Sequence, residues 1–236
     1  MLFLCLFKRN CHDLVTIRTE FGKIKQVLTE CILIIHRLWY NRGKMNRKKR
    51  LYMEKYYEIK VTIRESHPPT WRRLRIPADI TFNDLAAIIE IAFEWCGYHL
   101  YEFEVGSTLH EMGQFIGVPM EDEYDIESIR GKTLDSGKER IDKYFKEYKR
   151  MKFVYDFGDN WVHDVIVEKE INEKLENPIC IKAKSGAYPE DCGGTWGYEE
   201  YYPNDEGRKE LYIDFINDEL EGYKDFAEDL YNRDMF

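Results

Sequence analysis

The sequence of 236 residues lacks long apolar runs and closely spaced cysteines, and each absence excludes a class of protein. No apolar run approaches the roughly 20 residues that a membrane-spanning helix requires, and the candidate at residues 31–35 ends at His36 and Arg37. The apolar residues 1–7 precede the first basic residues, which is the reverse of a signal peptide. The six cysteines include no C-x-x-C pair, so we expect a reduced, cytoplasmic protein with no membrane partner.

Positive charge is scarce over most of the chain and concentrated at its start. Residues 1–52 hold 12 Lys and Arg against 3 Asp and Glu, a net charge of +9, whereas residues 53–236 hold 23 against 41, a net charge of −18. One hypothesis is therefore a nucleic-acid binder that uses the basic segment as an arm. The acidic remainder repels a phosphate backbone, so we expect no direct nucleic-acid binding by residues 53–236.

The basic segment also resembles a translated leader. Met53-Glu-Lys-Tyr-Tyr57 has the form of a natural start that runs into a strand, and Arg47-Lys-Lys-Arg50 requires purine-rich codons like those of a bacterial ribosome-binding site. We expect two parts in the chain. Residues 1–52 form a basic leader from an upstream start codon, or a poorly ordered or helical extension, and residues 53–236 form a single domain.

Alternation of apolar and polar residues predicts strands in this domain. The pattern is strict at residues 57–63, so every second side chain would face a core. A proline pair interrupts it, and residues 71–76 form the expected return strand. A further strand is predicted at residues 101–105. Residues 172–205 follow neither period and are expected to be ordered but irregular.

Helical spacing of apolar residues predicts an early helix and two C-terminal helices. Thr81 and Asp84 have the spacing of a helix start, an apolar stripe extends to Cys96, and Gly97 suits the end. A shorter helix is predicted at residues 139–148. The C-terminal stripes are Leu211, Phe215 and Ile216, and then Tyr223, Phe226 and Leu230. Together these elements predict an α+β domain with a mostly antiparallel sheet built from hairpins, packed against the early helix and the two C-terminal helices.

Residues 153–167 predict a β-hairpin with one apolar face. A three-residue loop, Gly158-Asp-Asn160, requires a left-handed residue at its third position, and Asn tolerates that conformation well. With this loop, six side chains share one face in three opposed pairs: Phe157 with Trp161, Tyr155 with His163, and Phe153 with Val165.

Several short motifs occur in the order typical of one protein family. They are Pro68-Pro-Thr-Trp-Arg-Arg73, the early helix, His99-Leu-Tyr-Glu-Phe103, Tyr155-Asp-Phe-Gly-Asp-Asn-Trp161 with His163, and Pro189-Glu-Asp-Cys-Gly-Gly-Thr-Trp-Gly-Tyr198. Over about residues 55–232 the chain resembles the plasmid pRiA4b ORF-3-like family, whose members also occur as transposon passengers. The resemblance implies a compact α+β fold. It implies no established reaction and therefore supplies no catalytic residues.

Three positions depart from the pattern of that family, and one of them, Asn160 in place of the usual glycine, suits the left-handed position of the loop. Tyr101 stands where a second histidine is common, and Ala187 where a cysteine is common, so two candidate metal ligands are missing. For His163 and Cys192, the alternative to metal binding is a place in the core, the histidine hydrogen-bonded to Tyr155. We therefore predict no cofactor, and the weak candidates for a structural zinc site are His99, His163, Cys180 and Cys192.

Carboxylates near the hairpin loop and the Gly-Gly pair support two interpretations. Asp156, Asp159, Glu190 and Asp191 suit acid–base catalysis if they share a cleft. Alternatively, Asp159 and Asp191 accept hydrogen bonds from backbone N–H groups in turns. We favour the second interpretation.

Arginines and aromatic residues offer two candidate binding surfaces. Alternation places Arg73 and Arg75 opposite Leu74, where we expect them to pair with acidic side chains of neighbouring strands, and a small anion is the alternative partner. An aromatic group in the irregular segment is typical either of an interface or of a small core under a loop. It comprises Tyr188, Trp196, Tyr198, Tyr201 and Tyr202.

These patterns favour a non-enzymatic binding or interaction domain linked to plasmid or mobile-element biology, with an unknown protein or a small anionic ligand as partner. The alternative is a hydrolase-like or metal-dependent enzyme that uses His99, His163 and nearby carboxylates in an open cleft. Complete burial of His163 would count against that enzyme. The binding site is expected to comprise Trp71, Arg73, His99, Asp156, Trp161, His163, Glu190, Asp191 and Trp196.

Overall fold

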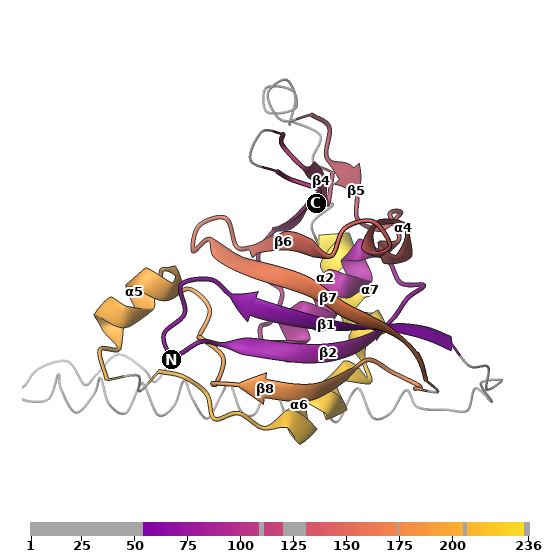
Figure 1. Cartoon of the computed structure of the whole chain (residues 1–236). Coiled ribbons are helices and arrows are strands. Elements are labelled where there is room, and N and C mark those ends of the chain that lie inside the picture. The colour runs from indigo at the N-terminus through magenta and orange to yellow at the C-terminus, as the bar shows by residue number, and fades with distance from the viewer. Residues whose placement is uncertain (1–53, 109–110, 120–130, 174, 205–206, 234–236) are drawn as a thin grey trace, which may run out of the picture. The chain divides into compact units, whose positions relative to one another are not determined.

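The computed structural model describes residues 54–108, 111–119, 131–173, 175–204 and 207–233, so the expected basic leader lies outside the described residues. Eight strands in this part form one sheet in the order β5-β4-β3-β6-β7-β1-β2-β8, antiparallel except for β4 and β5 (Figure 1). The strands are β1 (Glu54–Ile63), β2 (Trp71–Pro77), β3 (Tyr101–Val105), β4 (Gln114–Gly117), β5 (Leu134–Asp135), β6 (Arg150–Tyr155), β7 (Trp161–Glu173) and β8 (Ile179–Lys184). The described helices are α2 (Phe82–Ala92), α4 (Ile141–Phe145), α5 (Gly194–Tyr201), α6 (Ile213–Leu220) and α7 (Tyr223–Arg233).

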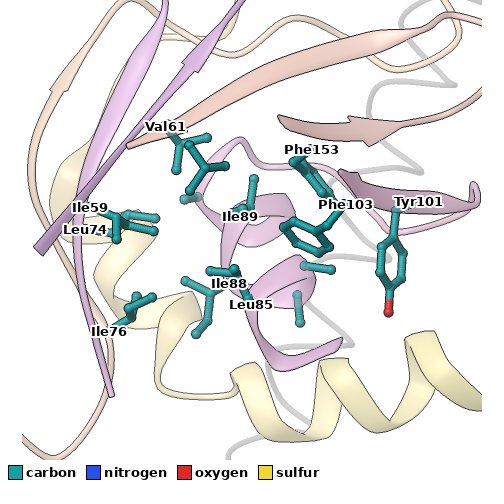
Figure 2. Packing of buried hydrophobic residues seen from close by; sticks show 14 of the residues in the cluster. Ile59, Val61, Leu74, Ile76, Leu85, Ile88, Ile89, Tyr101, Phe103 and Phe153 are labelled. Carbon is teal, nitrogen blue, oxygen red and sulfur yellow. The ribbon is translucent and has the colours of Figure 1, made fainter. Parts of the chain in front are cut away.

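The α+β class and the mostly antiparallel sheet are confirmed. Helix α2 packs against the inner face of the sheet, with Ile88 and Ile89 directed toward the strands that carry Val61, Leu74 and Phe103 (Figure 2). The two C-terminal helices α6 and α7 cover the other side of α2 (Figure 2). Every residue of α2 is buried, which follows from its position between these two layers.

Helix α2 begins as expected but ends earlier than expected. The hydroxyl of Thr81 accepts a hydrogen bond from the N–H of Asp84 at 3.1 Å, and the Asp84 carboxylate accepts one from the N–H of Thr81 at 2.9 Å, so the capping box is confirmed. The prediction that the helix extends to Cys96 is wrong. The chain leaves the helix after Ala92, and Glu94 adopts a left-handed φ of 58°.

The outer face of the sheet carries ion pairs between strands. Arg73 forms two hydrogen bonds with Glu168 of β7, at 2.6 and 2.8 Å, and Arg75 forms one with Glu58 of β1 at 3.1 Å. The expected pairing of these arginines with acidic neighbours is confirmed. Arg72 instead points to the inner face, where it is fully buried and donates to the carbonyl oxygens of Ala92, Ser185 and neighbouring residues.

The hairpin of β6 and β7 has the expected buried face but another register. The expected three-residue loop is wrong, because a five-residue connection over residues 156–160 pairs Tyr155 with Trp161 and Phe153 with His163. Asp156 departs from the extended conformation, with a φ of 55°, and its carbonyl oxygen accepts the N–H of Asn160 at 2.6 Å. The shift of two residues preserves the inward side of each strand but leaves Phe157 exposed.

The prediction that residues 172–205 are irregular throughout is also wrong. Strand β7 extends to Glu173, and the segment contains β8 and α5. Hydrophobic patterns missed β8 because it is an edge strand in which only Cys180 is buried. Patterns missed α5 because its buried residues are Gly194, Gly197 and Tyr198, of which only one has a large side chain. No helix of the described part is long and apolar enough to cross a membrane.

Candidate functional site

A histidine and two aspartates from three distant segments meet at one end of the sheet. Nε2 of His99 lies 3.0 Å from Oδ1 of Asp191 and 3.7 Å from Oδ2 of Asp156. One ligand atom from each residue lies within 4.8 Å of the other two, an arrangement found for no other set of His, Cys, Asp and Glu side chains among the described residues. We call these three residues the His–Asp–Asp cluster.

Pairing of β3 with β6 places two members of the cluster together. The antiparallel register sets Tyr101 opposite Tyr155, so the residues that precede β3 lie beside the residue that follows β6. These are His99 and Asp156. Gly158 N–H donates to Oδ1 of Asp156 at 2.9 Å, which orients the carboxylate and leaves Oδ2 toward His99.

Asp159 links the hairpin loop to the segment that carries Asp191, the third member of the cluster. Oδ2 of Asp159 accepts hydrogen bonds from the N–H groups of Cys192 at 3.0 Å and Gly193 at 2.9 Å, which are 33 and 34 residues away, so these are long-range contacts and not the local turn contacts expected for this carboxylate. Gly194 has a φ of 70°, and a Cβ atom there would lie 2.4 Å from the carbonyl oxygen of Asp159. Glycine therefore allows α5 to begin in contact with the hairpin loop, which positions Asp191.

Glu190 ties the loop before α5 to two other segments of the chain. Its carboxylate accepts a hydrogen bond of 2.5 Å from the Tyr155 hydroxyl and one of 2.9 Å from the N–H of Cys96. Burial, together with the negative charges of Glu90 and Glu190, raises the pKa of the Tyr155 hydroxyl far above its usual range. Tyr155 is therefore a permanent donor to Glu190, and neither side chain belongs to the cluster.

Six of the nine expected site residues lie outside the cluster, namely Glu190, Trp196 and the four described next. Trp161 and His163 point into the core, with 1% and 0% of their surface exposed, and Trp71 and Arg73 lie on the outer face of the sheet. The expected hydrogen bond from His163 to Tyr155 is wrong, because Nδ1 of His163 contacts the carbonyl oxygen of Trp161 at 3.0 Å. Burial lowers the pKa of His163 to about 4, which keeps the imidazole neutral at physiological pH.

The cysteines considered as metal ligands are buried apart from the cluster. Burial raises the pKa of the Cys192 thiol to about 11 and also raises that of Cys180, so both thiols are protonated at neutral pH. Cys192 packs as the small core residue that was the alternative interpretation. Of the four expected metal-ligand candidates, only His99 belongs to the cluster, and its other two members are aspartates.

Exposed aromatic and acidic side chains occur on the segments that carry the cluster and on α5, which follows Asp191. Trp196 is 78% exposed, and Glu199 and Glu200, three and four positions further along α5, share its face of the helix. Helix α5 lies beside the tip of the β6–β7 hairpin (Figure 1). We define the acidic–aromatic surface as Tyr98, Phe157, Asp191, Trp196, Glu199 and Glu200.

Two of the other aromatic residues of this segment form a small core, whereas Tyr201 and Tyr202 are 73% and 38% exposed. Tyr188 and Tyr198 are buried and pack edge to face, with ring centroids 4.8 Å apart. Sequence reasoning missed Arg208, whose guanidinium lies 4.0 Å from the Tyr188 ring centroid and donates to its hydroxyl at 2.5 Å. It also donates to the hydroxyl of Thr70 at 2.8 Å. No local pattern signals this role, since the partners lie 20 and 138 residues away.

Comparisons with known proteins agree with the motif pattern. The family model described as plasmid pRiA4b ORF-3-like protein matches residues 55–236. An uncharacterised protein, y4hQ, of Sinorhizobium fredii is 32% identical over 146 residues, which cover 61% of this chain and 69% of that protein. The crystal structure of MM3350, a protein of unknown function from Methanosarcina mazei Go1, shares 35% identity with a TM-score of 0.57, over 76% of this chain and 90% of that one. The chain belongs to the plasmid pRiA4b ORF-3-like protein family.

Proposed function

We propose that this domain is a non-enzymatic, cytoplasmic binding domain that holds a lysine- and arginine-rich segment of a partner protein on its acidic–aromatic surface. The observation that carries the proposal is the exposure of the Trp196 ring, 78%, next to Glu199 and Glu200 on one face of α5. Large aromatic rings are the commonest anchors of protein interfaces. Lysine and arginine also bind the faces of such rings through cation–π contacts.

The charge of the domain favours a cationic partner. Residues 53–236 carry a net charge of −18, which attracts basic segments and repels nucleic acid. A small anionic ligand is the weaker alternative, because the guanidinium groups of Arg73 and Arg75 are already bound to Glu168 and Glu58. The plasmid in the family description supports a partner from plasmid or mobile-element biology. The nucleic-acid arm at residues 1–52 stays a separate prediction outside the described residues.

The enzyme hypothesis loses one of its two histidines. His163 is fully buried among Phe93, Trp95 and Phe153, so it offers no group to a substrate in a cleft. The side chain of His99 is 28% exposed beside two carboxylates, although its Nε2 atom is shielded, and any chemistry would have to use that cluster alone. This arrangement supports a binding role more directly than a hydrolytic one.

Titration with labelled peptides tests the proposal. We expect a fluorescent peptide rich in lysine and arginine to bind, with an affinity that falls as salt is added, whereas a glutamate-rich peptide of equal length does not bind. Trp196→Ala should weaken binding by about tenfold or more. The matched control is Tyr212→Ala, which removes another exposed ring, on the residue before α6. Equal binding of both peptides, or an unchanged affinity for Trp196→Ala, would contradict the proposal.

A further inference from the structure

We propose that the His–Asp–Asp cluster is a binding site for a divalent transition metal ion, with Zn²⁺ as the best-matched ion. Its ligands are Nε2 of His99, Oδ2 of Asp156 and Oδ1 of Asp191. The inference goes beyond the proposed peptide binding and does not depend on it.

Distances within the cluster match a single metal ion. Zinc binds histidine nitrogen and carboxylate oxygen at about 2.0–2.2 Å, so two ligands in tetrahedral geometry lie roughly 3.3 Å apart. The two distances from His99 Nε2, 3.0 Å to Asp191 and 3.7 Å to Asp156, lie on either side of this value. All three atoms lie within 4.8 Å of one another, and the side chain of Asp191 is 72% exposed.

The two inner members of the cluster are enclosed but incompletely hydrogen-bonded. The side chain of Asp156 is 10% exposed and receives one N–H donor, from Gly158, at Oδ1. Nε2 of His99 is shielded from solvent and forms no hydrogen bond of suitable geometry with the described residues, although Asp191 is close. A buried carboxylate and a shielded imidazole nitrogen both require a partner, and a cation between them supplies it.

The surrounding structure holds the ligands in place. Asp156 and Asp191 adopt left-handed φ values of 55° and 57°, and the Gly158 N–H fixes the Asp156 carboxylate from outside the cluster. Edge-to-face packing against Tyr155, at 5.7 Å between ring centroids, orients the His99 ring. Three protein ligands leave at least one coordination position open to water or to a side chain of a partner.

Metal titration of the full-length chain tests the inference. After removal of bound metal with a chelator, Zn²⁺ should bind and raise the thermal unfolding temperature, and Co²⁺ should give visible absorption bands. His99→Gln, Asp156→Asn and Asp191→Asn should each weaken binding at least about tenfold, because each removes a ligand. Asparagine tolerates the left-handed conformation, so the aspartate variants should keep the metal-free unfolding temperature.

Two exposed side chains give matched controls. His67→Gln and Asp214→Asn remove the same chemical groups elsewhere and should leave the affinity unchanged. Residues 1–52 contain further histidines and cysteines that could bind added metal. The number of bound ions is therefore not decisive, and the test rests on the loss of affinity in the three variants. Absence of Zn²⁺ binding, or binding that all three ligand variants leave unchanged, would overturn the inference. Peptide titration without metal tests the acidic–aromatic surface separately.

Discussion

The hydroxyl group of Tyr155 donates a 2.5 Å hydrogen bond to the carboxylate of Glu190. This contact joins the last residue of β6 to the loop that carries Asp191, 35 residues further along the chain. The same hydroxyl accepts the N–H of Tyr98 at 3.1 Å. One buried phenol therefore connects all three segments of the His–Asp–Asp cluster.

Replacement of Tyr155 by Phe should destabilise the domain. The N–H of Tyr98 and the carboxylate of Glu190 both lose a partner in a partly buried place, which costs about 1–3 kcal/mol. Urea-induced unfolding measures this change in the free energy of unfolding. Tyr201→Phe, at an exposed ring, is the control and should cost almost nothing. An equal loss in both variants would show that the Tyr155 contacts are not responsible.

Replacement of Asp159 by Ala should release the loop before α5. The N–H groups of Cys192 and Gly193 lose a charged acceptor, which costs about 1.5–3 kcal/mol. Hydrogen–deuterium exchange should show faster exchange at these two amides, while the amides of β6 and β7 keep their protection. Unchanged exchange at Cys192 and Gly193 would show that other contacts hold the loop. Asp214→Ala, on the exposed side of α6, is the control.

Adjacent arginines on β2 should respond very differently to substitution. Arg72→Met removes the donor to the buried carbonyl oxygen of Ala92 and to the partly buried one of Ser185, and should cost about 2–4 kcal/mol. Arg73→Met breaks a partly exposed ion pair with Glu168 and should cost at most about 1 kcal/mol. Urea unfolding of the two variants gives the comparison. The opposite order would contradict the assignment of faces on β2.

The stability of the domain should fall in mild acid because of His163. Burial holds its pKa at about 4 in the folded state, whereas the unfolded chain titrates near 6.5. Below about pH 6.5 only the unfolded state gains the proton, so the free energy of unfolding falls, by about 3 kcal/mol once the pH reaches about 4.

His163→Phe removes this titration and should flatten the pH dependence between about pH 6.5 and 4, although the variant loses the contact with the Trp161 carbonyl and is less stable at neutral pH. Denaturation at several pH values measures the slope. His67→Gln, at an exposed position, should keep the slope of the unmodified protein. A slope unaffected by His163→Phe would assign the acid sensitivity to other groups.

The sequence by itself predicted the features that depend on residues close together in the chain. The capping box of Thr81 and Asp84 forms between residues three apart, and the alternation at residues 57–63 reports one buried face of β1, so both were predictable. The same holds for the inward side of the β6–β7 hairpin, because a shift of two residues does not change which side chains face the core. The family could also be predicted, since its motifs are short and ordered along the chain.

The tertiary structure decided the register of the hairpin and the composition of the site. The five-residue loop contains two left-handed residues, Asp156 and Asn160, of which the sequence pattern indicated only Asn160. Similarly, His99, Asp156 and Asp191 converge only because β3 pairs with β6 and Asp159 binds the loop before α5. The sequence by itself identified His99, Asp156 and Asp191 as candidate site residues, together with Trp161 and His163. Only the tertiary structure shows that Trp161 and His163 are buried in the core, because burial depends on packing between elements far apart in the chain.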